Sequence, residues 1–115
     1  MIEKREWRRI ETHLQATIRW ASSAKAHKAR IVNITPQGCC FVCDRELAMG
    51  TKVELTANFR GAGIAKLLSE VVWSGFLKKT GRYVTGVMIS TGDRDEYDKF
   101  LKFYNLHLLS VAHPS

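Results

Sequence analysis

The sequence has few of the features that would place it outside ordinary globular proteins. Only two of its 115 residues are proline, and its three cysteines are crowded into the segment GCCFVC, which is no disulfide framework. No apolar run approaches the roughly 18 residues that a membrane-spanning helix needs. The N-terminus is charged where a signal peptide would be apolar, and no repeat is present. We therefore expect one cytoplasmic domain that needs no covalent staples.

Acidic residues are scarce relative to basic ones. Eighteen Lys and Arg stand against eleven Asp and Glu, which gives a formal net charge of +7. This surplus favours an anionic partner: a nucleic acid, a phosphorylated small molecule, or an acidic protein or lipid surface. Simple solubility is the alternative, and composition does not decide between them. The basic residues are dense at the start, MIEKREWRRIE, where a solvated tail and an anion clamp are both reasonable interpretations.

Groups that could support catalysis or bind a metal are also few. His13 falls on the outward face of an expected strand, and no histidine neighbours a serine or cysteine in a nucleophile motif. Cys40 and Cys43 have the spacing of half a zinc site, but no second pair follows, and residues three apart on a strand point to opposite faces. We interpret the cysteines as core residues and the protein as a non-enzyme without a metal or cofactor.

Hydrophobic alternation predicts six strands. In THLQATIRW and TKVELTANF every second residue is apolar, which is the pattern of a strand with one buried face. The segment IAKLLSEVVWSGF is ambiguous by pattern, and its β-rich VVW favours a strand. The expected strands are 12–20, 29–34, 38–43, 51–59, 64–76 and 83–90. Short turns separate them, which is typical of an antiparallel barrel or sandwich.

The periodicity changes near the C-terminus. In DRDEYDKFLKFYNLHLLS, apolar residues recur at steps of three and four, which predicts one buried face of a helix, formed by Tyr97, Phe100, Leu101, Tyr104 and Leu108. Asp93 and Asp95 suit the positive end of the helix dipole. We expect a helix over 93–111, attached to an all-β core.

Two short motifs are informative only in combination. Arg5-x-x-x-Arg9 lies in KREWRRIE, and Asn33-x-Thr35-x-x-Gly38 lies in VNITPQGCCF. Either motif alone is weak, because an arginine-rich chain produces the first readily and the second also describes a capped turn. In this order and separation they resemble the RxxxR and [D/N]xSxxG motifs of the PilZ domain family. The resemblance continues through a Val-Val-Trp run at 71–73, a Gly-Val pair at 86–87 and the closing helix.

The resemblance carries expectations about fold and function. Members of the family fold as a six-stranded antiparallel barrel and typically bind the bacterial second messenger cyclic di-GMP (c-di-GMP). It implies one PilZ-like domain over 1–115, with 1–11 as a flexible arginine-rich segment. It also implies a non-catalytic receptor that changes conformation on binding and signals to a downstream protein, with motility and biofilm among the family's outputs. A PilZ-like adaptor that binds no nucleotide and acts through protein contacts is the alternative. DNA or RNA binding ranks well below both, and a homodimer is left open.

The same resemblance assigns roles within the site. Arg5 and Arg9 would be the clamp, because guanidinium forks bind guanine and phosphate in bidentate fashion and stack on rings. Asn33, Thr35 and Gly38 would form a platform, with Gly38 leaving room for the ligand and adopting an unusual φ.

Two further candidates and two departures from the family pattern refine these roles. Lys4 and Arg8 are additional candidates for ligand binding, and in this family a basic residue at the position of Lys4 accompanies a stacked pair of ligands. Thr35 stands where serine is usual, so an added methyl could crowd the ligand. Asn33 lacks the carboxylate that best pairs with guanine N–H groups.

Overall fold

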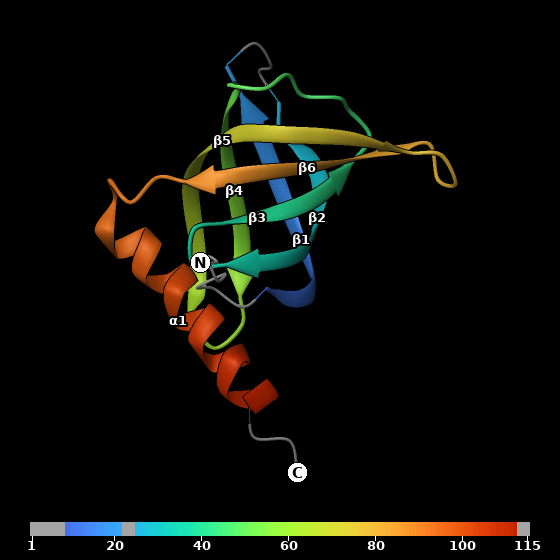
Figure 1. Ribbon diagram of the computed structural model, residues 1–115. Coiled ribbons are helices and arrows are strands. Elements are labelled where there is room, and N and C mark those ends of the chain that lie inside the picture. The colour runs from blue at the N-terminus through green and yellow to red at the C-terminus, as the bar shows by residue number, and fades with distance from the viewer. Residues whose placement is uncertain (1–8, 22–24, 113–115) are drawn as a thin grey trace, which may run out of the picture.

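The computed structural model describes residues 9–21 and 25–112, which form a closed barrel and one helix (Figure 1). The strands are β1 (Ile10–Trp20), β2 (His27–Thr35), β3 (Gly38–Cys43), β4 (Lys52–Phe59), β5 (Gly63–Leu77) and β6 (Arg82–Ile89), and the helix is α1 (Arg94–Ala112). The expected all-β fold with a C-terminal helix is confirmed, and the ambiguous segment 64–76 is a strand. Because β1 begins at Ile10, residues 10 and 11 of the expected flexible segment belong to a strand.

All neighbouring strands are antiparallel, in the order β1-β2-β3-β6-β5-β4, and β4 pairs back with β1. Register shifts in β1, β2 and β5 mark bulges, which add the bend that closing a small barrel requires. The shift in β2 lies between Ile31 and Asn33. For that reason Ile31 and Ile34 both point into the core although they are three residues apart.

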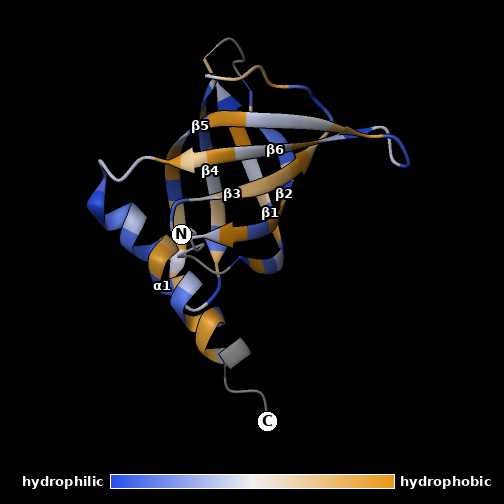
Figure 2. Ribbon diagram, in the orientation of Figure 1, coloured by the Kyte–Doolittle hydropathy of each residue, from blue (hydrophilic) through white to orange (hydrophobic). Residues whose placement is uncertain are grey.

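The barrel interior follows from the alternation in the sequence, which Figure 2 shows as alternating colours along the strands. Every second residue of β1 from Ile10 to Ile18 is buried. One of these positions is polar: Thr12 donates its hydroxyl to the Ile31 carbonyl at 2.9 Å. Ser69 in β5 does the same to the Val53 carbonyl, also at 2.9 Å. Both hydroxyls are satisfied, so their burial costs little.

Helix α1 lies against one end of the barrel (Figure 1). Aromatic side chains form much of this contact. Phe100 and Phe103 meet Phe59 edge to face, with ring centroids 5.7 and 5.3 Å apart. The periodicity of the sequence identified Phe100 but passed over Phe103, which is only 2% exposed. Within the described ranges, no helix combines the length and apolar content needed to cross a bilayer.

Candidate ligand-binding site

The described part of the two motifs meets on the outer face of the barrel. Arg9 precedes β1, Asn33 and Thr35 lie on β2, and Gly38 begins β3, yet all four line one open pocket of about 140 Å³. Lys4, Arg5 and Arg8 lie outside the described residues. The full lining is Arg9, Asn33, Thr35, Gln37, Gly38, Cys39, Cys40, Val72, Trp73, Gly86, Val87 and Met88. The barrel therefore unites residues as far apart in the sequence as Arg9 and Met88.

One row of the sheet forms the floor of this pocket. Asn33 is paired with Cys40, Cys40 with Gly86, and Gly86 with Trp73, so the row crosses four strands. Gly86 has no side chain, and a Cβ there would collide with the indole of Trp73. The glycine thus leaves room for the indole to lie close to the backbone of β6, where the tryptophan is 43% exposed. The floor combines an amide, a thiol and an aromatic surface.

Trp73 is the site residue that sequence reasoning missed. Val71 is buried and Trp73 is exposed, although regular alternation would turn residues two apart to the same face. A register shift between Val71 and Trp73 causes this change of side. The Val-Val-Trp run and the Gly-Val pair were visible in the sequence, but only the pairing of Trp73 with Gly86 shows that they meet.

The polar side chains at one end of the row converge on Cys40. Burial raises the pKa of the Cys40 thiol, while the positive charge of Arg9 and a hydrogen bond from Asn33 act in the opposite direction. Arg9 and Asn33 therefore both lie near the same sulfur. Cys40 is 7% exposed, borders the pocket and lies outside the core cluster, whereas Cys43 belongs to that cluster. The two cysteines of the Cys40-x-x-Cys43 spacing thus serve different faces of β3.

The turn between β2 and β3 is held in place from three directions. The hydroxyl of Thr35 accepts a hydrogen bond from the Gln37 backbone N–H at 3.2 Å. The carbonyl of Gln37 accepts one from the Ile89 N–H at 2.9 Å, and the carbonyl of Pro36 accepts one from the Tyr97 hydroxyl at 2.9 Å. As an acceptor, the Thr35 hydroxyl keeps its proton for donation. The turn is a preorganised support rather than a loop that a ligand would have to order.

The backbone conformation of Gly38 differs from the expected one, and the structure adds a packing role to this pocket residue. Its φ is not positive; the glycines with positive φ are Gly50, Gly61, Gly63 and Gly81. The expectation of an unusual φ at Gly38 is therefore wrong. A Cβ at Gly38 would collide with the carbonyl oxygen of Val87 on β6. Gly38 is needed because β3 and β6 approach closely beneath the turn.

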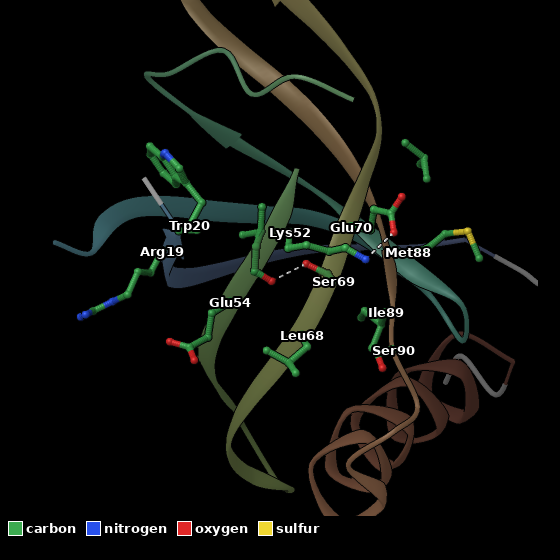
Figure 3. Close-up of a pocket in the computed structure, with 13 residues that line it drawn as sticks. Arg19, Trp20, Lys52, Glu54, Leu68, Ser69, Glu70, Met88, Ile89 and Ser90 are labelled. Atoms are coloured by element: carbon green, nitrogen blue, oxygen red, sulfur yellow. Dashed lines mark hydrogen bonds and ion pairs between the residues drawn. The ribbon is translucent and has the colours of Figure 1, made fainter. Parts of the chain in front are cut away.

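A larger hollow of about 720 Å³ lies further along the barrel surface and shares Val72 and Met88 with the pocket (Figure 3). Its lining is mostly apolar, and its charged side chains include the ion pair between Lys52 and Glu70, at 3.0 Å. Among the described residues that line it, the two basic side chains Arg19 and Lys52 are balanced by Glu54 and Glu70, so the smaller pocket is the better candidate for an anionic ligand.

The histidines do not build a catalytic group within the described residues. His13 is exposed, His27 stacks on Trp20 with ring centroids 4.6 Å apart, and His107 packs against Phe103 at 4.2 Å. No group of three or more potential metal ligands occurs in the described ranges.

A family model for the PilZ domain matches residues 3–105. The chain belongs to the PilZ domain family. The match covers both motifs and confirms the resemblance drawn from them. A search of curated proteins found nothing similar to this PilZ domain.

Solved structures share the fold at low sequence identity. The Bacillus subtilis inhibitor of motility MotI/DgrA has a TM-score of 0.77 at 14% identity, over 95% of this chain and 53% of that one. The K. pneumonia MrkH–c-di-GMP complex has 0.76 at 12%, over 99% and 56%. The PilZ domain of Escherichia coli YcgR with c-di-GMP has 0.65 at 10%, over 98% and 100%. This PilZ domain thus spans about half the length of the first two proteins and all of the third.

Proposed function

We propose that this PilZ domain is a non-catalytic receptor for c-di-GMP. The observation that carries the proposal is the convergence of Arg9, Asn33 and Thr35 with Trp73 around one open pocket. Structures of similar fold are described as complexes with c-di-GMP, which supports the same ligand class. The charge of +7 favours a dianionic ligand.

The pocket offers a partner for each part of that ligand. Guanine presents the acceptors O6 and N7, which suit the bidentate fork of Arg9. The amide of Asn33 can bond to a guanine edge, and the Thr35 hydroxyl can donate to a phosphate oxygen. The exposed face of Trp73 suits stacking by a base, an interaction worth about 1–3 kcal/mol in other nucleotide sites. The indole thereby supplies apolar surface that the motif residues lack.

The N-terminal residues complete the proposed site. Arg5, four positions before Arg9, would close over the ligand as the second half of the clamp, with Lys4 and Arg8 adding positive charge. Binding would then order this segment against the barrel and change the surface that a downstream protein meets. Control of motility or biofilm formation is the proposed class of output, and the cytoplasm is the proposed location.

Isothermal titration calorimetry with c-di-GMP tests the proposal directly. We expect saturable binding with a Kd of about 10 µM or tighter, and recovery of the nucleotide chemically unchanged. GMP and cyclic di-AMP serve as matched controls, because they carry phosphate without two guanines in one ring. Absence of binding heat would instead favour an adaptor that acts through protein contacts alone.

A further inference from the structure

The turn that joins β2 to β3 is of an uncommon kind for a hairpin of its length. Thr35 pairs with Gly38, so only Pro36 and Gln37 lie between the two strands. Two-residue hairpins favour turns that contain a positive φ, because such turns match the twist of the strands. Neither Pro36 nor Gln37 has a positive φ. We therefore expect contacts from outside the hairpin to matter for the geometry of this turn.

One such contact comes from α1. The hydroxyl of Tyr97 donates to the Pro36 carbonyl at 2.9 Å. The N–H of the same peptide group belongs to Gln37, and it donates to the Thr35 hydroxyl oxygen at 3.2 Å. Two hydrogen bonds thus meet on one peptide, one through its C=O and one through its N–H. Because the peptide is planar, a rotation that breaks the bond from Tyr97 also moves the N–H that Thr35 accepts.

We propose that Tyr97 is a positioning residue for the ligand site and acts on Thr35 through the Pro36–Gln37 peptide. Thr35 and Gln37 line the pocket, whereas Tyr97 does not. The N–H of Gln37 occupies an acceptor position of the Thr35 hydroxyl, which directs the hydroxyl proton away from the turn. Hydrogen bonds in a chain polarise one another, so the bond from Tyr97 strengthens the next one. The inference rests on the proposed function, because c-di-GMP is the ligand that would accept the Thr35 proton.

The surroundings of Tyr97 make it a fixed support for the turn. Its backbone N–H donates to the Asp93 carbonyl at 3.0 Å, and its ring centroid lies 6.4 Å from that of Phe100 in the core. Tyr97 is half-buried and Pro36 is buried. A hydrogen bond between partly buried groups is electrostatically stronger than one in water. The turn is thus held by a helix whose core contacts do not involve the pocket.

Titration calorimetry on a double-mutant cycle tests the proposal. Tyr97→Phe removes only the hydroxyl and should weaken c-di-GMP binding about threefold to tenfold. Thr35→Val removes the acceptor of the Gln37 N–H and nearly preserves the size of the side chain. In the Thr35→Val background, Tyr97→Phe should change the affinity very little, because the group through which Tyr97 acts is already absent. In the Thr35→Ser background, which keeps the hydroxyl, Tyr97→Phe should again cause the full loss.

A matched control and a measurement without ligand separate this role from a general loss of stability. Tyr83→Phe removes a hydroxyl from a half-buried tyrosine on β6 that packs against Phe76 and does not line the pocket. It should leave the affinity unchanged. In the ligand-free protein, hydrogen exchange of the Gln37 amide, measured by NMR, should be faster in Tyr97→Phe than in the wild type, while circular dichroism stays the same.

The outcomes distinguish this inference from the proposed function. A wild type without binding heat overturns the proposed function, whereas the exchange rate of the Gln37 amide still decides whether Tyr97 holds the peptide. If the wild type binds c-di-GMP and Tyr97→Phe binds it equally well, the positioning role alone is overturned. An equal loss of affinity in the wild-type and Thr35→Val backgrounds would also overturn it, because Tyr97 would then act on the fold rather than through Thr35. An unchanged exchange rate of Gln37 would do the same.

Discussion

Arg9 is the residue of the proposed clamp that the structure places, and its surroundings explain what it could contribute. It lies at the pocket beside Asn33 and Cys40, and it is exposed. An exposed guanidinium contributes little to the free energy of unfolding, because solvent screens its charge. Its contribution to the free energy of binding should be larger, because a bound ligand displaces this solvent and accepts hydrogen bonds from the guanidinium group. Arg9 is therefore the position where binding and stability should separate most cleanly.

Replacing Arg9 by alanine should weaken c-di-GMP binding by about 2–3 kcal/mol, or roughly 30- to 150-fold, because a charge-assisted bidentate contact is lost. Titration calorimetry measures the change. Arg94→Ala removes the same charge from an exposed position on α1, where Arg94 contacts Asp98 at 3.8 Å, and should leave the affinity near that of the wild type. Equal affinities for the wild type and Arg9→Ala would remove Arg9 from the site.

Gly38→Ala should behave in the opposite way. Its added methyl would collide with the Val87 carbonyl, so the free energy of unfolding should fall by about 1–3 kcal/mol even without ligand. Urea denaturation measures this change. Gly92→Ala is the control, since the nearest contact of its Cβ would be 3.4 Å away. A Gly38→Ala variant as stable as the wild type that fails only in binding would assign Gly38 to ligand contact instead.

At the scale of elements, hydrogen bonds join α1 both to the turn between β2 and β3 and to β5. Tyr97 donates to the Pro36 carbonyl of the turn, while Glu96 accepts the Lys66 backbone N–H at 2.6 Å. Lys99 bonds to both Glu96 and the Ile64 carbonyl, at 3.3 and 3.0 Å. A ligand that moves the 35–38 turn would therefore act on α1 through Tyr97. Glu96 attaches the helix to β5 through the Lys66 backbone N–H.

The pKa of Glu96 gives this attachment a pH dependence. The Lys66 backbone N–H, followed by Lys99, lowers the pKa below its ordinary value of 4.5. A carboxyl with a lowered pKa contributes stability that is present above its unfolded pKa and is lost as the pH falls through the folded value. Glu96→Gln should therefore flatten the loss of stability below about pH 4.5 while leaving a smaller stability at pH 7. Thermal unfolding at several pH values measures both, and parallel curves for the two proteins would contradict the assignment.

For the whole molecule, the ligand should stabilise the fold by mass action. The barrel core and the turn are already formed, so the nucleotide would bind the folded chain and have no comparable site on the unfolded one. A concentration of c-di-GMP about 100 times its Kd should raise the free energy of unfolding by about 2.7 kcal/mol. Urea denaturation with and without nucleotide measures the shift. If the urea concentration at the midpoint of unfolding is unchanged at saturating nucleotide, the nucleotide does not bind preferentially to the folded chain.

Local patterns carried most of the fold prediction. Period-two alternation located β1 and β4, turn chemistry separated β2 from β3, and the change of period located α1. These signals are local because each side chain's burial depends on the face to which its own backbone turns it. The same reasoning failed at Trp73 and Phe103. A bulge reversed the face of Trp73, and the packing of α1 around Phe59 widened its buried stripe to include Phe103.

The order of residues along the chain thus determined the class of fold, the family and the motif positions Asn33, Thr35 and Gly38, because these depend on residue type and short spacing. Only the tertiary structure decided that Trp73 and Gly86 join Arg9 in one pocket, and that Gly38 serves strand packing. The physical reason is register. Which residues become neighbours across strands depends on bulges and on how far each pairing extends, and no local stretch of sequence encodes either.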